Sequence, residues 1–379
     1  MKRISIFFAG DFCSKPSTSH ITVSDELKGL IKSCDLKVVN FEVPLKPDGL
    51  FPQQKYERFW QNDDSPVFLR NLGFNLFTMA NNHVFDWGDE GYKKTKRVLG
   101  EQSFGSGMYD EAYKVKVCEV NGAKIGFMAL SYAAYTGVFN DVLNRDGLGC
   151  AFINDLRVNH DIMNAKKVVD FLFVLPHDGI EYIDVPLPET IARYRDFIDF
   201  GADGVIGTHP HCPQGWEEYK GKPIFYSLGN FFFNSKESPQ YHANKPHWYE
   251  GMCVKVELDP GGIFYNVINT QNTDNVLLTI DHRHVRAEQN EKLVLYLKDK
   301  EEYAHYLKEK CQQLTESMEM PIIDKTFHIN TLKQCAKLLF KNWARHIRGK
   351  KFEDDLSLMV LLKNDTRNNL LKRGIKGKM

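Results

Sequence analysis

The stretch FLFVLPHDGIE, residues 171–181, decides the fold class of this chain. It opens with an unbroken apolar run, which is typical of a strand buried on both faces. The run ends directly in polar residues, among them His177 and Glu181. Because sites in α/β sheets form beyond the carboxyl ends of such strands, the stretch predicts a buried strand and the edge of a site.

Similar apolar runs recur in the first two-thirds of the chain, at residues 4–9, 36–41, 75–79, 124–130, 204–206 and 224–228. Helices are predicted between them, at residues 24–34, 89–101 and 188–200. Pro260-Gly261-Gly262 predicts a hairpin that joins residues 255–258 to residues 263–270. The alternation of strands and helices predicts an α/β fold.

The pattern changes near residue 287, where charged, helix-like sequence begins. We therefore predict an α/β region over residues 1–286 and a helical, basic region over residues 287–379. Its helices are expected at residues 288–318, 332–347 and 354–362. Residues 333–379 hold 13 Lys or Arg against 4 Asp or Glu. This tail is interpreted either as a solvated appendage or as a contact with an anionic membrane surface or polyanion.

Composition limits the classes of partner and compartment. The chain carries 49 basic and 49 acidic residues, so its overall charge indicates no nucleic-acid partner. The apolar run at residues 4–9 is too short for a signal peptide, and no stretch reaches the ~20 apolar residues of a membrane-spanning helix. Eight cysteines without a CxxC pair indicate reduced thiols. We expect a cytoplasmic protein, whose basic tail could reach the inner face of the membrane.

Polar clusters follow six of the predicted strands. They are Gly10-Asp11, Asn40-Phe41-Glu42, Asn81-Asn82-His83, the segment from His177 to Glu181, His209-Pro210-His211 and Gly229-Asn230. Packing alone does not explain so many Asp, Glu, Asn and His residues at strand ends. The three histidines His177, His209 and His211 are therefore predicted to bind metal. Extended backbone would point His209 and His211 to opposite faces, so a loop must turn both rings toward one point.

The remaining clusters offer oxygen ligands. Asp11 and Glu42 supply carboxylates and Asn82 a carbonyl oxygen, although Asp11 and Asn82 are also common in turns. A mixed His, carboxylate and Asn set suits Mn, Fe or Zn better than Ca or Mg alone. Glu181 is predicted to hold a histidine by a hydrogen bond. Asn40, Asn81 and Asn230 are expected to lie behind the ligands or to contact substrate.

His83 is predicted to face the substrate rather than the metal, where it could donate a proton to a leaving group. Asp86, three residues later, has two interpretations. It could fix the tautomer of His83, or it could cap the helix that begins near Gly88. The segment at residues 240–251, rich in His, Trp and Tyr, could cover the site.

Taken in order, these clusters resemble the CapA family, named for poly-γ-glutamate capsule synthesis. The resemblance covers roughly residues 3–270 and includes Tyr226-Ser227-Leu228-Gly229-Asn230-Phe231. It implies a four-layer α/β/β/α sandwich like that of calcineurin-like metallophosphoesterases, followed here by a C-terminal helical appendage. It also implies a dinuclear centre with Asp11, Glu42, Asn82, His177, His209 and His211 as ligands, and His83 beside them.

Two positions depart from the phosphoesterase pattern. Asp11-Phe12-Cys13 stands where Asp-x-His is usual, and Glu42 stands where Asp is usual. We therefore expect one metal position to be weaker or to hold a different ion.

The resemblance implies a metal-dependent hydrolase of capsule or exopolysaccharide biosynthesis, acting on a phosphorylated or anionic polymer. Phosphoesters are its expected substrates, and an amide bond is within reach of the same chemistry. The alternative is a non-catalytic accessory protein of capsule assembly or export, which would bind polymer, carrier lipid or synthesis proteins.

Overall fold

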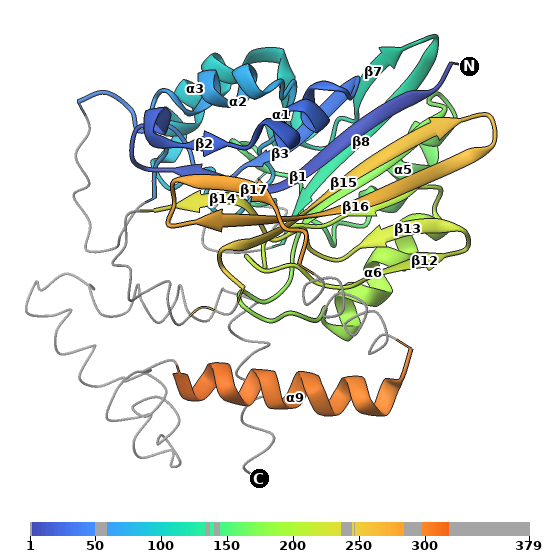
Figure 1. Ribbon diagram of the computed structural model, residues 1–379. Coiled ribbons are helices and arrows are strands. Elements are labelled where there is room, and N and C mark those ends of the chain that lie inside the picture. Colours follow the sequence, from blue (N-terminus) through green and yellow to red (C-terminus); the bar gives the residue numbers. More distant parts are fainter. Residues whose placement is uncertain are drawn as a thin grey trace, which may run out of the picture. The chain divides into compact units, whose positions relative to one another are not determined.

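The computed structural model describes residues 2–49, 59–132, 137–139, 145–235, 245, 247–283 and 298–317 (Figure 1). Contacts within the chain divide it into two units, Met1–Tyr303 and Ala304–Met379. The first unit contains the sheets and every predicted site residue.

Two mixed sheets form the centre of the first unit. In spatial order, the described strands of the larger sheet are β2 (Thr22–Val23), β17 (Leu277–Ile280), β16 (Gly262–Thr273), β15 (Glu250–Asp259), β1 (Ile4–Ser14), β3 (Leu36–Phe41), β4 (Leu76–Thr78) and β5 (Ser103–Phe104), with β14 (Asn230–Asn234) also paired to β1. On one side of β1 the strands are parallel, with β3 paired to β1, β4 to β3 and β5 to β4. β14 also pairs with β1 in the parallel direction. The hairpin of β15 and β16 pairs with β1 in the antiparallel direction.

The second sheet, again in spatial order, consists of β12 (Trp216–Tyr219), β13 (Lys222–Phe225), β11 (Gly204–Ile206), β10 (Phe171–His177), β8 (Ala123–Ser131) and β7 (Lys116–Val120). Its four central strands are parallel, and its two edge strands are antiparallel. The short strands β6 (Ser106–Gly107) and β9 (Gly149–Cys150) form a separate pair.

The described helices are α1 (Asp25–Lys32), α2 (Ser65–Leu72), α3 (Gly88–Leu99), α4 (Tyr109–Ala112), α5 (Arg157–Lys166), α6 (Pro188–Asp199) and α9 (Lys300–Ser317), with 3-10 turns η1 (Thr18–His20) and η2 (Gly100–Gln102). Local sequence sets several of their ends. The Ser24 side chain accepts a hydrogen bond from the Leu27 amide at the start of α1. Gly73, with φ 108°, ends α2, and Pro188 is the first residue of α6.

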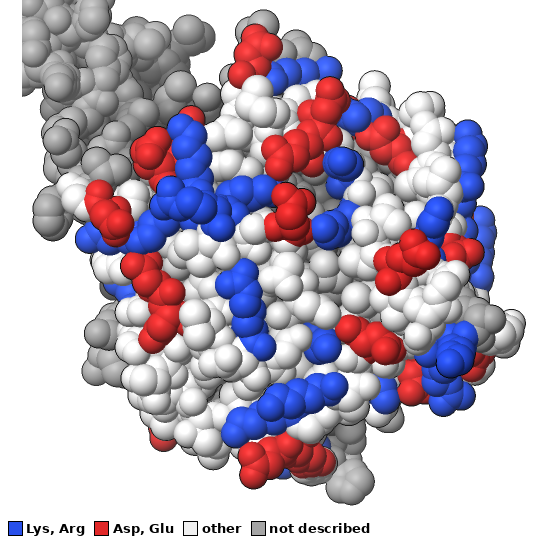
Figure 2. Space-filling model, turned by 90° about the horizontal axis from the view of Figure 1, so that it is seen from above, with Lys and Arg blue, Asp and Glu red and all other residues white. Residues whose placement is uncertain are grey.

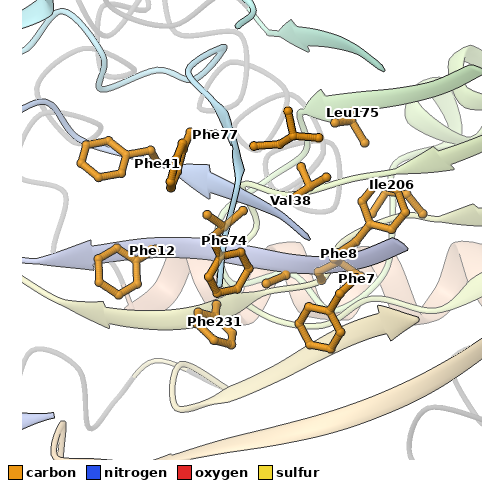
Figure 3. Packing of buried hydrophobic residues seen from close by; sticks show 14 of the residues in the cluster. Phe7, Phe8, Phe12, Val38, Phe41, Phe74, Phe77, Leu175, Ile206 and Phe231 are labelled. Carbon is orange, nitrogen blue, oxygen red and sulfur yellow. The ribbon is translucent and has the colours of Figure 1, made fainter. Parts of the chain in front are cut away.

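Alternation along β1 explains why the two sheets pack face to face. Phe8 lies 5.3 Å from the ring of Phe173 in β10, whereas Phe7 lies 6.3 Å from Phe74, which follows α2. Neighbouring side chains of a strand point to opposite faces, and Figure 3 shows Phe7 and Phe8 on opposite sides of β1. Each fully buried phenylalanine stabilises the fold by about 1.5–3 kcal/mol. The core between the sheets therefore fixes the position of β1 relative to β10.

The outer face of the second sheet is covered by helices. Met128 and Val174, which point away from the first sheet, join a core cluster with Ile162 of α5 and Tyr194 and Phe197 of α6. On the other side of the molecule, Leu27 of α1 and Leu69 of α2 are buried against the larger sheet. Helices thus cover both outer faces of the pair of sheets (Figure 1).

The predicted α/β class is confirmed, as are the hairpin of β15 and β16 and strands at all seven predicted positions. One boundary bears on the site, because β1 runs on to Ser14 and does not end at Ala9. Asp11 therefore lies within a strand, where it pairs with Asn40 on one side and Asn230 on the other. The pairing shifts register at Asp11, as a bulge does. The strand predicted at residues 224–228 ends at Phe225, and α2 and α5 were not predicted.

The helix α9 lies within the helix predicted at residues 288–318. The other two predicted helices and the basic tail lie outside the described residues. None of the helices in the described ranges has the length and apolar character that crossing a membrane requires. Figure 2 shows acidic and basic side chains interspersed on one face, in keeping with the zero net charge.

Candidate metal centre

The two sheets bring the ends of four strands and the interior of β1 to one place. The larger sheet supplies Asp11 from β1, Glu42 after β3 and Asn82 after β4. The second sheet supplies His177 at the end of β10, and His209 and His211 after β11. All six side chains are buried, and Asp11, Glu42 and His209 are 0% exposed.

These residues form two overlapping groups. Glu42, His177 and His209 make one, and Asp11, Glu42 and His211 make the other. In each group the candidate ligand atoms lie within 4.8 Å of one another. Glu42 belongs to both, and its Oε1 lies 3.8 Å from His177 Nε2 and 3.7 Å from His211 Nε2. A cation in either group would therefore share the Glu42 carboxylate with a cation in the other.

Several buried polar atoms of the site have no hydrogen-bond partner among the residues that the structure describes. They are both carboxylate oxygens of Glu42, both ring nitrogens of His209, and Nδ2 of Asn82. A buried polar group without a partner destabilises a fold by about 1–3 kcal/mol, and a charged group by more. Carboxylate oxygens and imidazole nitrogens are donors that divalent ions such as Mn, Fe and Zn bind. The donor set therefore fits cations, which would give Glu42 and His209 the partners they lack.

The charge states agree with this fit. Burial raises the pKa of Asp11, and burial together with the Asp11 charge raises that of Glu42 well above its ordinary value. Burial holds the pKa of His177 and of His209 well below the ordinary value, helped by the neighbouring histidines. These shifts favour the neutral form of both imidazoles, the form that binds a metal, and a bound cation would favour ionised carboxylates.

Asparagine side chains and a threonine orient the carboxylate of Asp11. Asn40 Nδ2 donates to Asp11 Oδ1 at 2.7 Å. The side-chain oxygen of Asn40, Oδ1, accepts hydrogen bonds from Thr78 Oγ1 at 2.9 Å and from Asn81 Nδ2 at 3.2 Å. Asp11 Oδ2 accepts from the backbone amide of His209 at 3.1 Å, which ties β1 to the loop after β11. Asn40 and Asn81 therefore lie behind the ligands, one of the two places predicted for them.

Two histidines are held through their Nδ1 atoms. His177 Nδ1 lies 3.0 Å from Thr208 Oγ1, and its Nε2 lies 2.8 Å from Asn82 Oδ1. His211 Nδ1 donates to Asn230 Oδ1 at 2.9 Å. Such contacts fix the ring orientation and leave Nε2 toward Glu42. Asn230 thereby gains a definite role, which is to position His211.

Backbone strain explains how His209 and His211 face one site. Their φ angles are +105° and +55°, which break the alternation of extended backbone. Val43, next to Glu42, and Tyr182 also have positive φ, at 98° and 67°. Non-glycine residues in such conformations are destabilised by about 1–3 kcal/mol and cluster at functional sites. The sequence prediction that a loop must turn both rings is met by this unusual backbone.

His83 and Asp86 form a pair beside the ligands. His83 Nδ1 lies 2.9 Å from Asp86 Oδ2, and the Phe59 ring packs edge-on against the imidazole at 5.0 Å. Trp87, not Asp86, is the N-cap of α3, and α3 has no side-chain cap. Of the two interpretations of Asp86, the geometry agrees with the one in which it fixes the tautomer. Burial lowers the pKa of His83, but the charge and hydrogen bond of Asp86 outweigh it and the net shift is upward.

Replacement of Asp86 by asparagine is expected to lower the pKa of His83, because the negative charge that opposes burial is lost. Titration of the His83 ring protons by NMR measures the effect. Asp89→Asn, in the exposed first turn of α3, is the matched control and should leave that titration unchanged. An unaltered His83 titration in the Asp86 variant would show that the pair has no electrostatic role.

Glu181 lies four residues after His177 in the sequence, and Cys13 lies two residues after Asp11. The charge of Glu181 helps to raise the pKa of both Glu42 and His83. Among the described hydrogen bonds, none joins Glu181 to a site histidine, so Glu181 acts on the site through its charge.

Cys13 is fully buried in β1. Of the covering segment predicted at residues 240–251, the structure describes residues 245 and 247–251, and the Trp248 ring among them packs on the ring of His211.

Sequence reasoning missed several contacts of the site. The ring of Tyr132 lies 4.5 Å from that of His209, and the ring of Trp248 lies 5.0 Å from that of His211. Thr208, which holds His177, was part of a quoted cluster but was given no role. Tyr132 follows the end of β8, so the strand-end pattern could have identified it. Phe59 comes from a segment without a strand pattern, and the sequence carried no signal for it, whereas Trp248 lies in the segment predicted at residues 240–251 to cover the site.

Comparison with known proteins identifies relatives of this chain. A family model described as bacterial capsule synthesis protein PGA_cap matches residues 5–235. The PGA biosynthesis protein CapA of Bacillus subtilis (strain 168) is 29% identical over 263 residues, which are 64% of this chain and 68% of that protein. The capsule biosynthesis protein CapA of Bacillus anthracis is 29% identical over 230 residues, which are 56% of this chain and 55% of that protein.

Among solved structures, a phosphatase from Mycoplasma pneumoniae resembles this chain with a TM-score of 0.43 and 15% identity. The similarity covers 76% of this chain and 97% of the phosphatase.

Proposed function

The chain belongs to the bacterial capsule synthesis protein PGA_cap family, and we propose that it is a metal-dependent hydrolase of the metallophosphoesterase type that acts in capsule biosynthesis. Its substrate would be a phosphorylated or anionic polymer. The proposed partners are other capsule or exopolysaccharide synthesis proteins.

One observation carries the proposal, namely that Glu42 is shared by two buried groups while its own oxygens lack hydrogen bonds. A shared carboxylate between two ligand sets is what a pair of adjacent cations requires. We propose two divalent ions, chosen among Mn, Fe and Zn, with His177, His209 and Asn82 on one side and Asp11 and His211 on the other. When bound, such ions polarise a phosphoryl oxygen and lower the pKa of a coordinated water.

The residues of this chain would complete the chemistry. Asp86 Oδ2 accepts from Nδ1 of His83, which directs proton exchange with substrate to Nε2. The raised pKa of His83 favours the protonated ring, so it can act as the general acid toward a leaving oxygen. Asn40 and Asn230 hold Asp11 and His211 in place, so that their positions need not change during the reaction.

The experiment compares the purified full chain with the variant His209→Ala/His211→Ala, using manganese and a panel of phosphomonoesters and phosphodiesters. We expect kcat/KM of the variant to fall by about a hundredfold or more, since each position loses a ligand. The double variant His160→Ala/His282→Ala is the control, because both of those rings are 69% exposed. It should keep full activity.

The hydrolase proposal would be refuted if the wild-type chain bound no metal and if no ester were turned over faster by the wild type than by the His209→Ala/His211→Ala variant. The accessory alternative, in which the protein binds polymer or synthesis proteins without catalysis, would then account for its family membership.

A further inference from the structure

A buried serine joins the two segments that carry His211 and Asn230. Ser227 lies between β13 and β14 and is 0% exposed. Its hydroxyl donates to the carbonyl oxygen of Cys212 at 2.9 Å and accepts from the amide of Gly229 at 3.1 Å. One hydroxyl thus uses its donor and its acceptor on two backbone groups, each of which directly neighbours a site residue in the sequence.

The bond to Cys212 holds the end of the loop after β11. His211, the preceding residue, has φ +55°, a conformation that a non-glycine residue keeps only when its surroundings impose it. Pro213, the following residue, has no amide hydrogen with which to anchor this stretch. The Gln214 amide then donates to the backbone oxygen of Ser227 at 3.0 Å. Ser227 therefore holds the chain on both sides of Pro213 and keeps the backbone of His211 in its strained form.

The bond to Gly229 fixes the turn that places Asp11 and Asn230. Gly229 has φ +65°, and its carbonyl oxygen accepts from the Asp11 amide at 3.0 Å. Asn230, the next residue, accepts from His211 Nδ1 through Oδ1 and pairs with Asp11 between β14 and β1. The two ligands proposed for one metal position, Asp11 and His211, therefore depend on backbone that Ser227 connects.

The histidines of the other metal position are held by different contacts. Thr208 Oγ1 lies 3.0 Å from His177 Nδ1. The His209 amide donates to Asp11 Oδ2 at 3.1 Å. The start of the loop after β11 is thus tied to β10 and β1, whereas the end of the loop is tied to Ser227.

We propose that Ser227 is a positioning residue for one metal position only, that of Asp11 and His211. The position of His177 and His209 should not depend on it. The proposal rests on the proposed function, because that function supplies the two cations. Partners that orient a ligand without touching the metal typically change metal affinity by roughly 10–100-fold. Since Ser227 acts through the backbone beside the ligands, we expect an effect at the lower end of this range.

The test uses the full chain, freed of metal with EDTA and titrated with manganese in a calorimeter. The wild type should take up two ions. In Ser227→Ala we expect the first ion to bind as in the wild type and the second to bind about tenfold or more weakly. EPR spectroscopy should then show an isolated manganese ion in place of an exchange-coupled pair. Ser227→Thr, which retains a hydroxyl, should restore the second ion.

A readout without metal accompanies the titration. Amide hydrogen exchange in the metal-free chain should be faster at Gly229 in Ser227→Ala, because this amide loses its acceptor. Ser65→Ala is the matched control for both measurements. Ser65 is also 0% exposed, and its hydroxyl has no hydrogen-bond partner within the described ranges. This variant should bind both ions and exchange at Gly229 like the wild type.

A folded Ser227→Ala that bound both ions like the wild type, or bound both more weakly by the same factor, would overturn the positioning role. If alanine prevents folding, Ser227→Cys, which keeps a weak donor, allows the same comparison. A wild type that bound no manganese would contradict this role and the proposed function together. A wild type that bound two ions but hydrolysed no ester would refute only the proposed function.

Discussion

Replacement of Glu42 by glutamine is expected to remove most of the bound metal and to lower kcat/KM by roughly a thousandfold or more. Glu42 is the one residue that belongs to both ligand groups, so its loss affects both positions at once. Glutamine has nearly the same size but lacks the negative charge that two cations would share. Metal content after dialysis and turnover of a phosphoester measure the two effects.

The fold should survive this substitution, which separates loss of metal from loss of structure. Burial and the charge of Asp11 raise the pKa of Glu42 well above its ordinary value, which favours the neutral acid in the metal-free chain. Glutamine imitates that form, and the metal-free variant should unfold at the temperature of the metal-free wild type. A variant that retained two ions per chain would show that Glu42 is not shared between metal positions.

Replacement of Gly10 by alanine is expected to destabilise the protein by about 3 kcal/mol or more. A Cβ at this position would lie 1.9 Å from the carbonyl oxygen of Gly229, which is backbone and cannot rotate away. The same oxygen accepts a hydrogen bond from the Asp11 amide at 3.0 Å. The clash would therefore separate β1 from Gly229 where Asp11 and Asn230 are placed. Denaturant unfolding measures the change in free energy.

Gly29→Ala is the matched control for this variant. Gly29 lies inside α1, and a Cβ there would meet nothing within 4 Å. Alanine in a helix interior is favoured over glycine by roughly 1 kcal/mol, so this change should stabilise slightly. If Gly10→Ala were as stable as the wild type, the close approach of β1 to Gly229 would be wrong.

The strands and the polar residues at their ends were predictable because both depend on local sequence. Apolar runs such as residues 36–41 and 204–206 match β3 and β11 residue for residue. The predicted histidines and carboxylates do converge, since parallel strands bring their carboxyl ends to the same edge. The apolar runs alone could not predict that strand ends from two different sheets meet at one site.

The rest depends on contacts between distant segments. The unbroken apolar run stops at Ala9, yet β1 continues through Asp11 because β3 and β14 both pair with it there. The positive φ angles of His209 and His211 have no signature in residue type, since glycine is the residue that favours them. The place of Phe59 follows from how its loop packs on His83, which pattern and propensity do not encode.

Anomalous X-ray diffraction from crystals of the full chain grown with manganese tests the central claim most directly. Two anomalous peaks are predicted, one beside His177 and His209 and the other beside Asp11 and His211, with the Glu42 carboxylate between them. No peak within reach of these side chains, or a single peak that leaves Glu42 without a metal neighbour, would contradict the two-metal account.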